Sequence, residues 1–137
     1  MDVHSPQTRS YNMSRIKGKN TKPEMQVRRY LHSKGYRYGL HSAKMPGKPD
    51  LVLSKHKTVV FVHGCFWHGH TGCRFFVVPN TRRYWWLKKI RHNKTNDRRN
   101  SMALRRNGWK VINVWECQLR PKGLKKTLTK LLQEIDL

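Results

Sequence analysis

Residues 50–63 read DLVLSKHKTVVFVH. Two apolar, β-branched runs, at 50–53 and 58–62, flank a short polar segment, which is the pattern of a β-hairpin. With the turn centred near His56, paired positions sum to 112, and Asp50 then lies across from Val62. The hairpin therefore predicts an acidic side chain close to the point where the second strand ends and the segment His63-Gly64-Cys65 begins.

The segments around this hairpin alternate between helical and strand patterns. A helix is predicted at 21–34, because Thr21, Pro23 and Glu24 form a capping box and Gly35 offers a stop. We expect a strand at 36–41, a long basic helix at 81–107 with room for a break near 93–96, a strand at 109–115 and an amphipathic helix at 121–135. This order predicts an α/β fold with a mixed central sheet flanked by helices.

The composition indicates a polyanionic partner. Lys and Arg outnumber Asp and Glu by 30 to 7 in 137 residues, a formal net charge of +23. Nucleic acid is the first partner to consider, although charge alone is equally typical of basic proteins that catalyse nothing. We expect residues 1–20 to be a basic DNA-binding arm and residues 21–137 to be a single domain. Without an apolar signal segment or a run long enough to span a bilayer, a cytoplasmic protein is expected.

Thiols and imidazoles concentrate in one short segment. Cys65, His68, His70 and Cys73 fall within nine residues, and Cys117 follows the strand predicted at 109–115. Three cysteines and one histidine are a ligand set of structural Zn²⁺ sites. The spacing alone leaves open which histidine binds, and also whether the thiols are simply buried apolar side chains.

Several motifs add to this pattern. Pro49-Asp50 precedes the first hairpin strand, His63-Gly64-Cys65-Phe66-Trp67-His68 follows the second, and Trp115-Glu116-Cys117 ends the last strand. In these motifs, and nearly end to end, the chain resembles the very-short-patch-repair (Vsr) family of DNA mismatch endonucleases. The resemblance implies a restriction-endonuclease-like core. Val62-His63-Gly64 stand where that core usually carries a second carboxylate and a lysine.

The resemblance also implies catalytic roles. Asp50 and the backbone carbonyl of Val62 would bind Mg²⁺, His68 would be the general base, and His63 and Glu24 would support them. The family usually has threonine at the position of Val62, so a main-chain ligand is kept while a hydroxyl is lost. Glu24 has an alternative explanation in the capping box.

Zinc and DNA ligands follow from the same resemblance. It assigns Zn²⁺ to Cys65, His70, Cys73 and Cys117, in a loop one residue longer than the family's usual loop. It assigns the DNA contacts to an aromatic wedge and its neighbours, namely Phe66, Trp67, Trp86, Met13, Lys89 and Asn93. Core packing is the alternative for the rings. The remaining histidines have no ligand-like neighbours in sequence and are expected to be solvated or locally satisfied: His4, His32, His41, His56 and His92.

We therefore expect a Mg²⁺-dependent, zinc-stabilised endonuclease that nicks duplex DNA 5′ to the thymine of a T:G mismatch, the product of 5-methylcytosine deamination. The resemblance further implies a functional link to a cytosine-C5 methyltransferase and to repair polymerase and ligase, and association with the bacterial nucleoid. A target without two-fold symmetry suits a monomer. Two alternatives stay open: a related nicking enzyme of different or low specificity, and a zinc-stabilised DNA-binding protein without catalysis.

Overall fold

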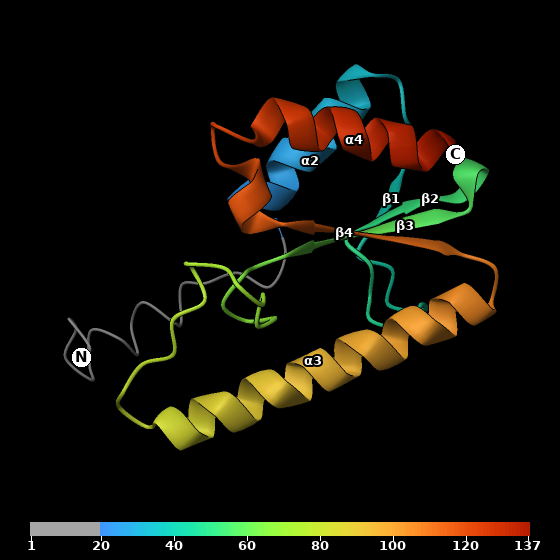
Figure 1. The fold of residues 1–137 in the computed structure, drawn as a ribbon. Helices are drawn as coiled ribbons and strands as arrows, with labels where there is room; N and C mark the ends of the chain where they lie inside the picture. Colours follow the sequence, from blue (N-terminus) through green and yellow to red (C-terminus); the bar gives the residue numbers. More distant parts are fainter. Residues whose placement is uncertain (1–19) are drawn as a thin grey trace.

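The computed structural model describes residues 20–137 (Figure 1). The predicted basic arm, including Met13, thus lies outside the described residues except for Asn20. The elements are α2 (Lys22–Ser33), β1 (Gly39–Leu40), β2 (Leu51–Leu53), η1 (Ser54–His56), β3 (Thr58–His63), α3 (Arg83–Arg106), β4 (Lys110–Trp115), η2 (Glu116–Leu119) and α4 (Leu124–Asp136). This order of helices and strands confirms the prediction.

The four strands form one mixed sheet in the order β1-β2-β3-β4. β1, β2 and β3 are antiparallel neighbours, whereas β4 pairs with β3 in parallel. A parallel pair needs a crossover connection, and α3 provides it. The carboxyl ends of β3 and β4 therefore meet at one edge of the sheet, where His63 pairs with Trp115.

Helices cover both faces of the sheet. Figure 1 shows α2 and α4 together on one side and the long α3 on the other. Alternate residues of β3 face opposite layers, so Val60 packs with Leu31 and Leu131, while Phe61 packs with Leu104. No helix within residues 20–137 is both long and apolar enough to cross a membrane.

The predicted hairpin register was wrong by one residue. Leu51 pairs with Val60 and Leu53 with Thr58, so paired numbers sum to 111. The turn closes through η1 and Lys57, whose left-handed backbone (φ 50°) returns the chain into β3. Because the turn has four residues and no central one, a register centred on His56 cannot form.

Three elements also differ from the prediction in their length or continuity. α3 is unbroken across 93–96, because Asn93 and Thr95 hydrogen-bond to Trp67 and Arg91 carbonyls instead of interrupting the helix. The strand expected at 36–41 is short, since the Tyr36 N–H still closes the end of α2 on Leu31. α4 begins at 124 because Pro121–Gly123 form a turn on the Arg120 carbonyl.

Candidate active site and metal centre

Asp50 lies at the end of β3, where the hairpin predicted an acidic group. Its carboxylate accepts a hydrogen bond of 2.7 Å from the Val62 N–H. Burial raises the pKa of Asp50 to about 6, while the Val62 N–H acts in the opposite direction. The register shift therefore leaves the predicted proximity intact, through the side chain of Asp50 instead of through direct strand pairing.

Glu24 and His41 flank Asp50 from the side of α2. Glu24 is 2% exposed, and its two carboxylate oxygens lie 3.0 and 2.9 Å from Nε2 of His41. Glu24 also accepts the Asn20 N–H at 3.1 Å, so it serves helix capping and this cluster together. Ligand atoms of Glu24, His41 and Asp50 all lie within 4.8 Å of one another. His41, which was expected to be solvated or locally satisfied, is thus held by Glu24 next to Asp50.

A second cluster, His63, His68 and Asp97, lies on the α3 side of the same strand end. The rings of His63 and His68 are 4.0 Å apart, and His68 Nδ1 lies 2.6 Å from Asp97 Oδ2. His63 Nε2 is 3.1 Å from Asn113 Oδ1 on β4. Burial, followed by the nearby His68, lowers the pKa of His63 to about 4, so this imidazole is neutral near pH 7.

Asp97 was not among the predicted site residues. It is the single acidic residue of α3, which spans 24 residues and is otherwise rich in Lys and Arg. The signal that could have identified Asp97 in the sequence is its position as the one carboxylate on a basic helix. Its contact with Nδ1 leaves Nε2 of His68 as the nitrogen that can take up a proton.

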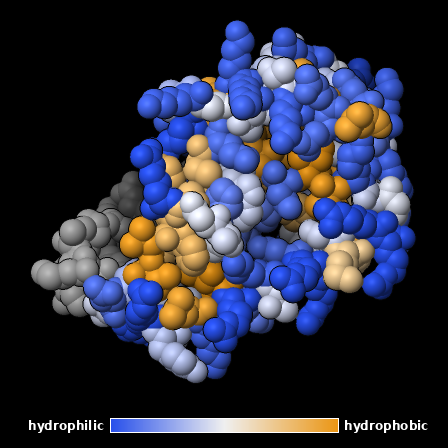
Figure 2. All heavy atoms as spheres, in the orientation of Figure 1, coloured by the Kyte–Doolittle hydropathy of each residue, from blue (hydrophilic) through white to orange (hydrophobic). Residues whose placement is uncertain are grey.

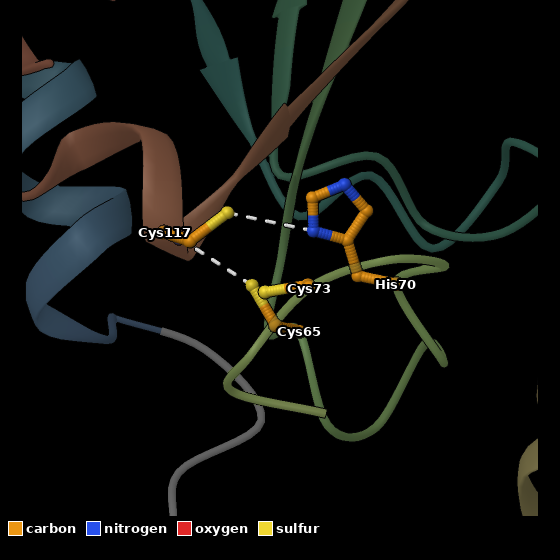
Figure 3. Close-up of side chains that lie close together, drawn as sticks. All are labelled: Cys65, His70, Cys73 and Cys117. Atoms are coloured by element: carbon orange, nitrogen blue, oxygen red, sulfur yellow. Dashed lines mark hydrogen bonds between the residues drawn. The ribbon is translucent and has the colours of Figure 1, made fainter. Parts of the chain in front are cut away.

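The predicted metal ligands Cys65, His70, Cys73 and Cys117 converge in Figure 3, with all ligand atoms within 4.8 Å of one another. Cys117 Sγ lies 3.4 Å from His70 Nδ1, and the Cys117 N–H donates to Cys65 Sγ at 3.4 Å. The parallel pairing of β3 and β4 explains this meeting, because Cys65 and Cys117 each follow one of these strands.

This donor set fits a single zinc ion. Zn²⁺ bonds to sulfur and nitrogen at about 2.0–2.3 Å, so four atoms this close together can share one tetrahedral ion. The Cys117 and Phe75 N–H groups donate to the sulfur atoms of Cys65 and Cys73, and such hydrogen bonds favour the thiolate form that a metal requires. The structure also separates the two histidines that spacing could not, because His70 joins the cysteines while His68 faces Asp97.

The aromatic residues predicted to meet DNA form one cluster. Phe66, Trp67 and Trp86 have ring centroids between 5.3 and 5.8 Å apart. Trp86 is 7% exposed, and its indole N–H is buried without a hydrogen-bond partner among the described residues. Trp85, which the sequence analysis did not single out, is 44% exposed beside it. Figure 2 shows apolar side chains gathered over this part of the molecule, within a largely hydrophilic surface.

α3, which itself carries Trp85 and Trp86, also holds the loop that carries Phe66 and Trp67. The Asn93 side-chain amide donates to the Trp67 carbonyl at 2.9 Å, while Lys89 is exposed. Gly69 lies against α3 with φ +59°, and a Cβ there would meet Ile90 Cγ2 at 2.7 Å. Glycine at 69 therefore lets the loop approach the helix closely, between His68 and His70.

Comparison with known proteins identifies the family of this chain. A family model described as "DNA mismatch endonuclease Vsr" matches residues 1–74. The chain is 42% identical over 135 residues to the DNA mismatch endonuclease Vsr of Escherichia coli, covering 97% of this chain and 86% of the relative. The chain belongs to the Vsr family.

Other Vsr relatives are named as nicking enzymes. The chain is 48% identical over 122 residues to the type II nicking enzyme V.XorIIP of Xanthomonas oryzae, with 89% of both chains covered. It is 44% identical over 135 residues to the type II nicking enzyme V.NmeAIP of Neisseria meningitidis, covering 98% of this chain and 96% of the relative. These relatives confirm that this Vsr chain is an endodeoxyribonuclease, a DNA mismatch endonuclease.

The acidic residues of this Vsr chain are concentrated at the two clusters. Residues 20–137 contain six carboxylate side chains, and Glu24, Asp50 and Asp97 are three of them. Negative charge would repel the phosphates of DNA if nothing intervened. Carboxylates at these positions in an otherwise basic endonuclease are therefore candidates for binding a cation or transferring a proton.

Proposed function

We propose that this Vsr endonuclease requires Mg²⁺ and nicks duplex DNA 5′ to the thymine of a T:G mismatch. The observation that carries the proposal is the placement of Asp50, on the Val62 N–H, at the same strand end as the His68–Asp97 pair. This arrangement brings a buried carboxylate and an oriented imidazole to one edge of the sheet. It favours phosphodiester hydrolysis over DNA binding alone.

Asp50 and the Val62 carbonyl are the proposed Mg²⁺ ligands. The N–H and C=O of one strand residue point to the same side, so the Val62 carbonyl faces the side on which Asp50 lies. Oxygen atoms are the ligands that Mg²⁺ prefers. Burial disfavours the charged form of the Asp50 carboxylate, and a cation bound next to it would stabilise that form. When bound, Mg²⁺ would stabilise charge on the scissile phosphate and on the departing 3′ oxygen. Glu24 and His41 close the site on its α2 side.

His68 is the proposed general base. Asp97 holds its Nδ1, so Nε2 is available to take a proton from water as the water oxygen bonds to phosphorus and the P–O3′ bond breaks. Asp97 then stabilises the imidazolium that results. His63 stays neutral and is held by Asn113, which suits it to orienting the water or the phosphate.

Mismatch preference is proposed to come from the aromatic cluster. Inserting rings into DNA costs stacking energy, and a mispaired step costs less to open than a paired one. Phe66 and Trp67 are half-buried and would contact the bases, with Trp86 supporting them from below. Asn93 fixes Trp67, and exposed Lys89 would face the mismatch. Met13 is the proposed second wedge.

Zn²⁺ at Cys65, His70, Cys73 and Cys117 is proposed to be structural. All four positions are filled by protein atoms, which leaves no open coordination site for catalysis. His68 lies between the ligands Cys65 and His70, so this centre would hold the catalytic base in place. We further propose a restriction-endonuclease-like core, a monomer, and a functional link to a cytosine-C5 methyltransferase and to repair polymerase and ligase.

A comparison of duplexes tests the proposed activity. Two labelled duplexes that differ in a single T:G or T:A pair are incubated with the protein in Mg²⁺ or in EDTA. The proposal predicts a nick in the T:G duplex alone, and in Mg²⁺ alone. Equal cutting of both duplexes would indicate a less selective nicking enzyme, and cutting in EDTA would remove Mg²⁺ from the mechanism.

A further inference from the structure

An open pocket of about 770 Å³ lies beside the cysteine cluster, between the loop that follows β3 and the beginning of α4. Its walls include Arg74, Phe75, Arg120 and Lys122, and no acidic side chain lines it. None of these four residues belongs to the clusters described above. The proposed zinc ligands His70, Cys73 and Cys117 form another part of the wall. The positive charge of the pocket therefore comes from residues that have no role in the proposed catalysis or zinc binding.

Stacking on one ring orients two of these cations. The guanidinium carbons of Arg74 and Arg120 lie 4.9 and 4.1 Å from the ring centroid of Phe75. Neither guanidinium forms an ion pair or hydrogen bond with another residue in the described part of the chain. A stacked guanidinium keeps its edge N–H groups free, and these groups match the two oxygens of a phosphate.

The pocket is close to the catalytic histidines. His70, in its wall, stacks on Trp115 at 4.0 Å, and Trp115 lies 5.0 Å from His63. Lys94 of α3 reaches the same loop, with its Nζ 3.4 Å from Thr71 Oγ1. A DNA strand that is cut beside His68 and continues along this edge would therefore pass the pocket.

We propose that Arg74 and Arg120, held by Phe75, bind backbone phosphates of the DNA strand that continues from the cut. The inference rests on the catalytic site proposed above, because that site fixes where the strand begins. The two arginines extend the DNA contacts of the enzyme beyond the mismatch. Since phosphate contacts carry no base information, they strengthen binding to matched and mismatched duplexes equally.

Binding measured across a salt series tests the proposal. Fluorescence anisotropy in EDTA, which prevents Mg²⁺-dependent cutting, gives the Kd of a labelled duplex for the wild type and for Arg74→Gln/Arg120→Gln. We expect the slope of log K against log salt to decrease by about 1 for each arginine, with the same change on T:G and T:A duplexes. Phe75→Leu keeps both charges but removes the platform, and should weaken binding by a smaller factor.

A matched control removes the same charge elsewhere. Lys34 and Lys55 lie by the hairpin turn, at the opposite end of the sheet from His63. Lys34→Gln/Lys55→Gln should keep a slope near that of the wild type. An unchanged slope in the arginine variant, or an equal decrease in the control, would overturn the proposal.

Two further measurements separate this inference from the proposed function. Zinc content and Tm should match the wild type in Arg74→Gln/Arg120→Gln, which shows that the cysteine cluster next to the pocket is intact. At saturating enzyme, this variant should nick at nearly the wild-type rate. If the wild type failed to nick T:G duplexes, the proposed function would fail while the salt slopes still decided whether the pocket binds phosphate.

Discussion

The imidazole of His68 and the carboxylate of Asp97 lie 2.6 Å apart, although 29 positions separate them in the chain. His68 belongs to the loop after β3 and Asp97 to α3, so the contact joins a loop to the layer beneath it. A carboxylate at Nδ1 selects the tautomer of the ring and stabilises its protonated form. The pair is therefore suited to taking a proton from water at Nε2.

Replacing Asp97 with asparagine should slow the chemical step without weakening DNA binding. The amide cannot compensate the charge of a protonated His68 and can stabilise the wrong tautomer. We expect the single-turnover nicking rate to fall by about 10²-fold or more, and its pH dependence to change. Glu134→Gln, which removes a half-buried carboxylate paired with Lys130 on α4, is the matched control and should nick normally. A rate for Asp97→Asn within two-fold of the control would exclude this role.

Asp50→Asn should bind DNA but not cut it. The amide oxygen can still accept the Val62 N–H, while a neutral side chain is a poor Mg²⁺ ligand. Because burial raises the pKa of Asp50, the fold disfavours its charge, and the metal-free variant should melt at or above the wild-type Tm. Mg²⁺-dependent nicking by this variant would remove Asp50 from the mechanism.

Replacing a zinc ligand should lower both the zinc content and the Tm of the protein. His70→Ala and Cys117→Ala each remove one of four converging ligands, and we expect less than stoichiometric zinc and a lower Tm. His32→Ala, at an exposed position on α2, should keep the metal. Zinc content is measured by atomic emission and stability by thermal unfolding. Full zinc content and an unchanged Tm in Cys117→Ala would show that Cys117 is not a ligand of the metal.

Gly69→Ala should disturb the loop that carries His68 and His70. The left-handed backbone costs a non-glycine residue about 1–2 kcal/mol, and the new Cβ would also meet Ile90 at 2.7 Å. Gly35→Ala is the control, because Gly35 also has a left-handed backbone (φ +84°) but a Cβ there would meet no atom within 4 Å. The difference between the two variants therefore measures the effect of the clash alone. We expect Gly69→Ala to have a lower Tm and to nick more slowly than Gly35→Ala. Equal effects of the two substitutions would exclude the close approach as the cause.

Local patterns predicted much of the fold. The capping residues around Thr21 and Glu24 placed the start of α2, and the apolar runs placed β2, β3 and β4. Their order predicted a mixed sheet, whose parallel pair then brings Cys65 together with Cys117. Motifs that act within one segment, or at the ends of neighbouring strands, are thus visible in the sequence.

Contacts between distant layers were not predictable in this way. Asp97 meets His68 only because α3 packs beneath the loop, and His41 meets Glu24 only because β1 ends beside α2. The hairpin register depends on one residue with a left-handed backbone, Lys57. Glycine or asparagine is typical of that conformation and lysine is not, so the turn could not be recognised from its residues. These features follow from tertiary packing, which residue spacing does not encode.

Mapping the position of the nick tests the central claim most directly. A T:G duplex labelled in turn at each of its four ends is cut in Mg²⁺ and resolved beside size markers and the Asp50→Asn variant. The account predicts one nick, in the strand that contains the mismatched thymine and on its 5′ side, leaving a 3′-hydroxyl and a 5′-phosphate, with no product from Asp50→Asn. A cut in the guanine strand, or cuts scattered over both strands, would contradict it.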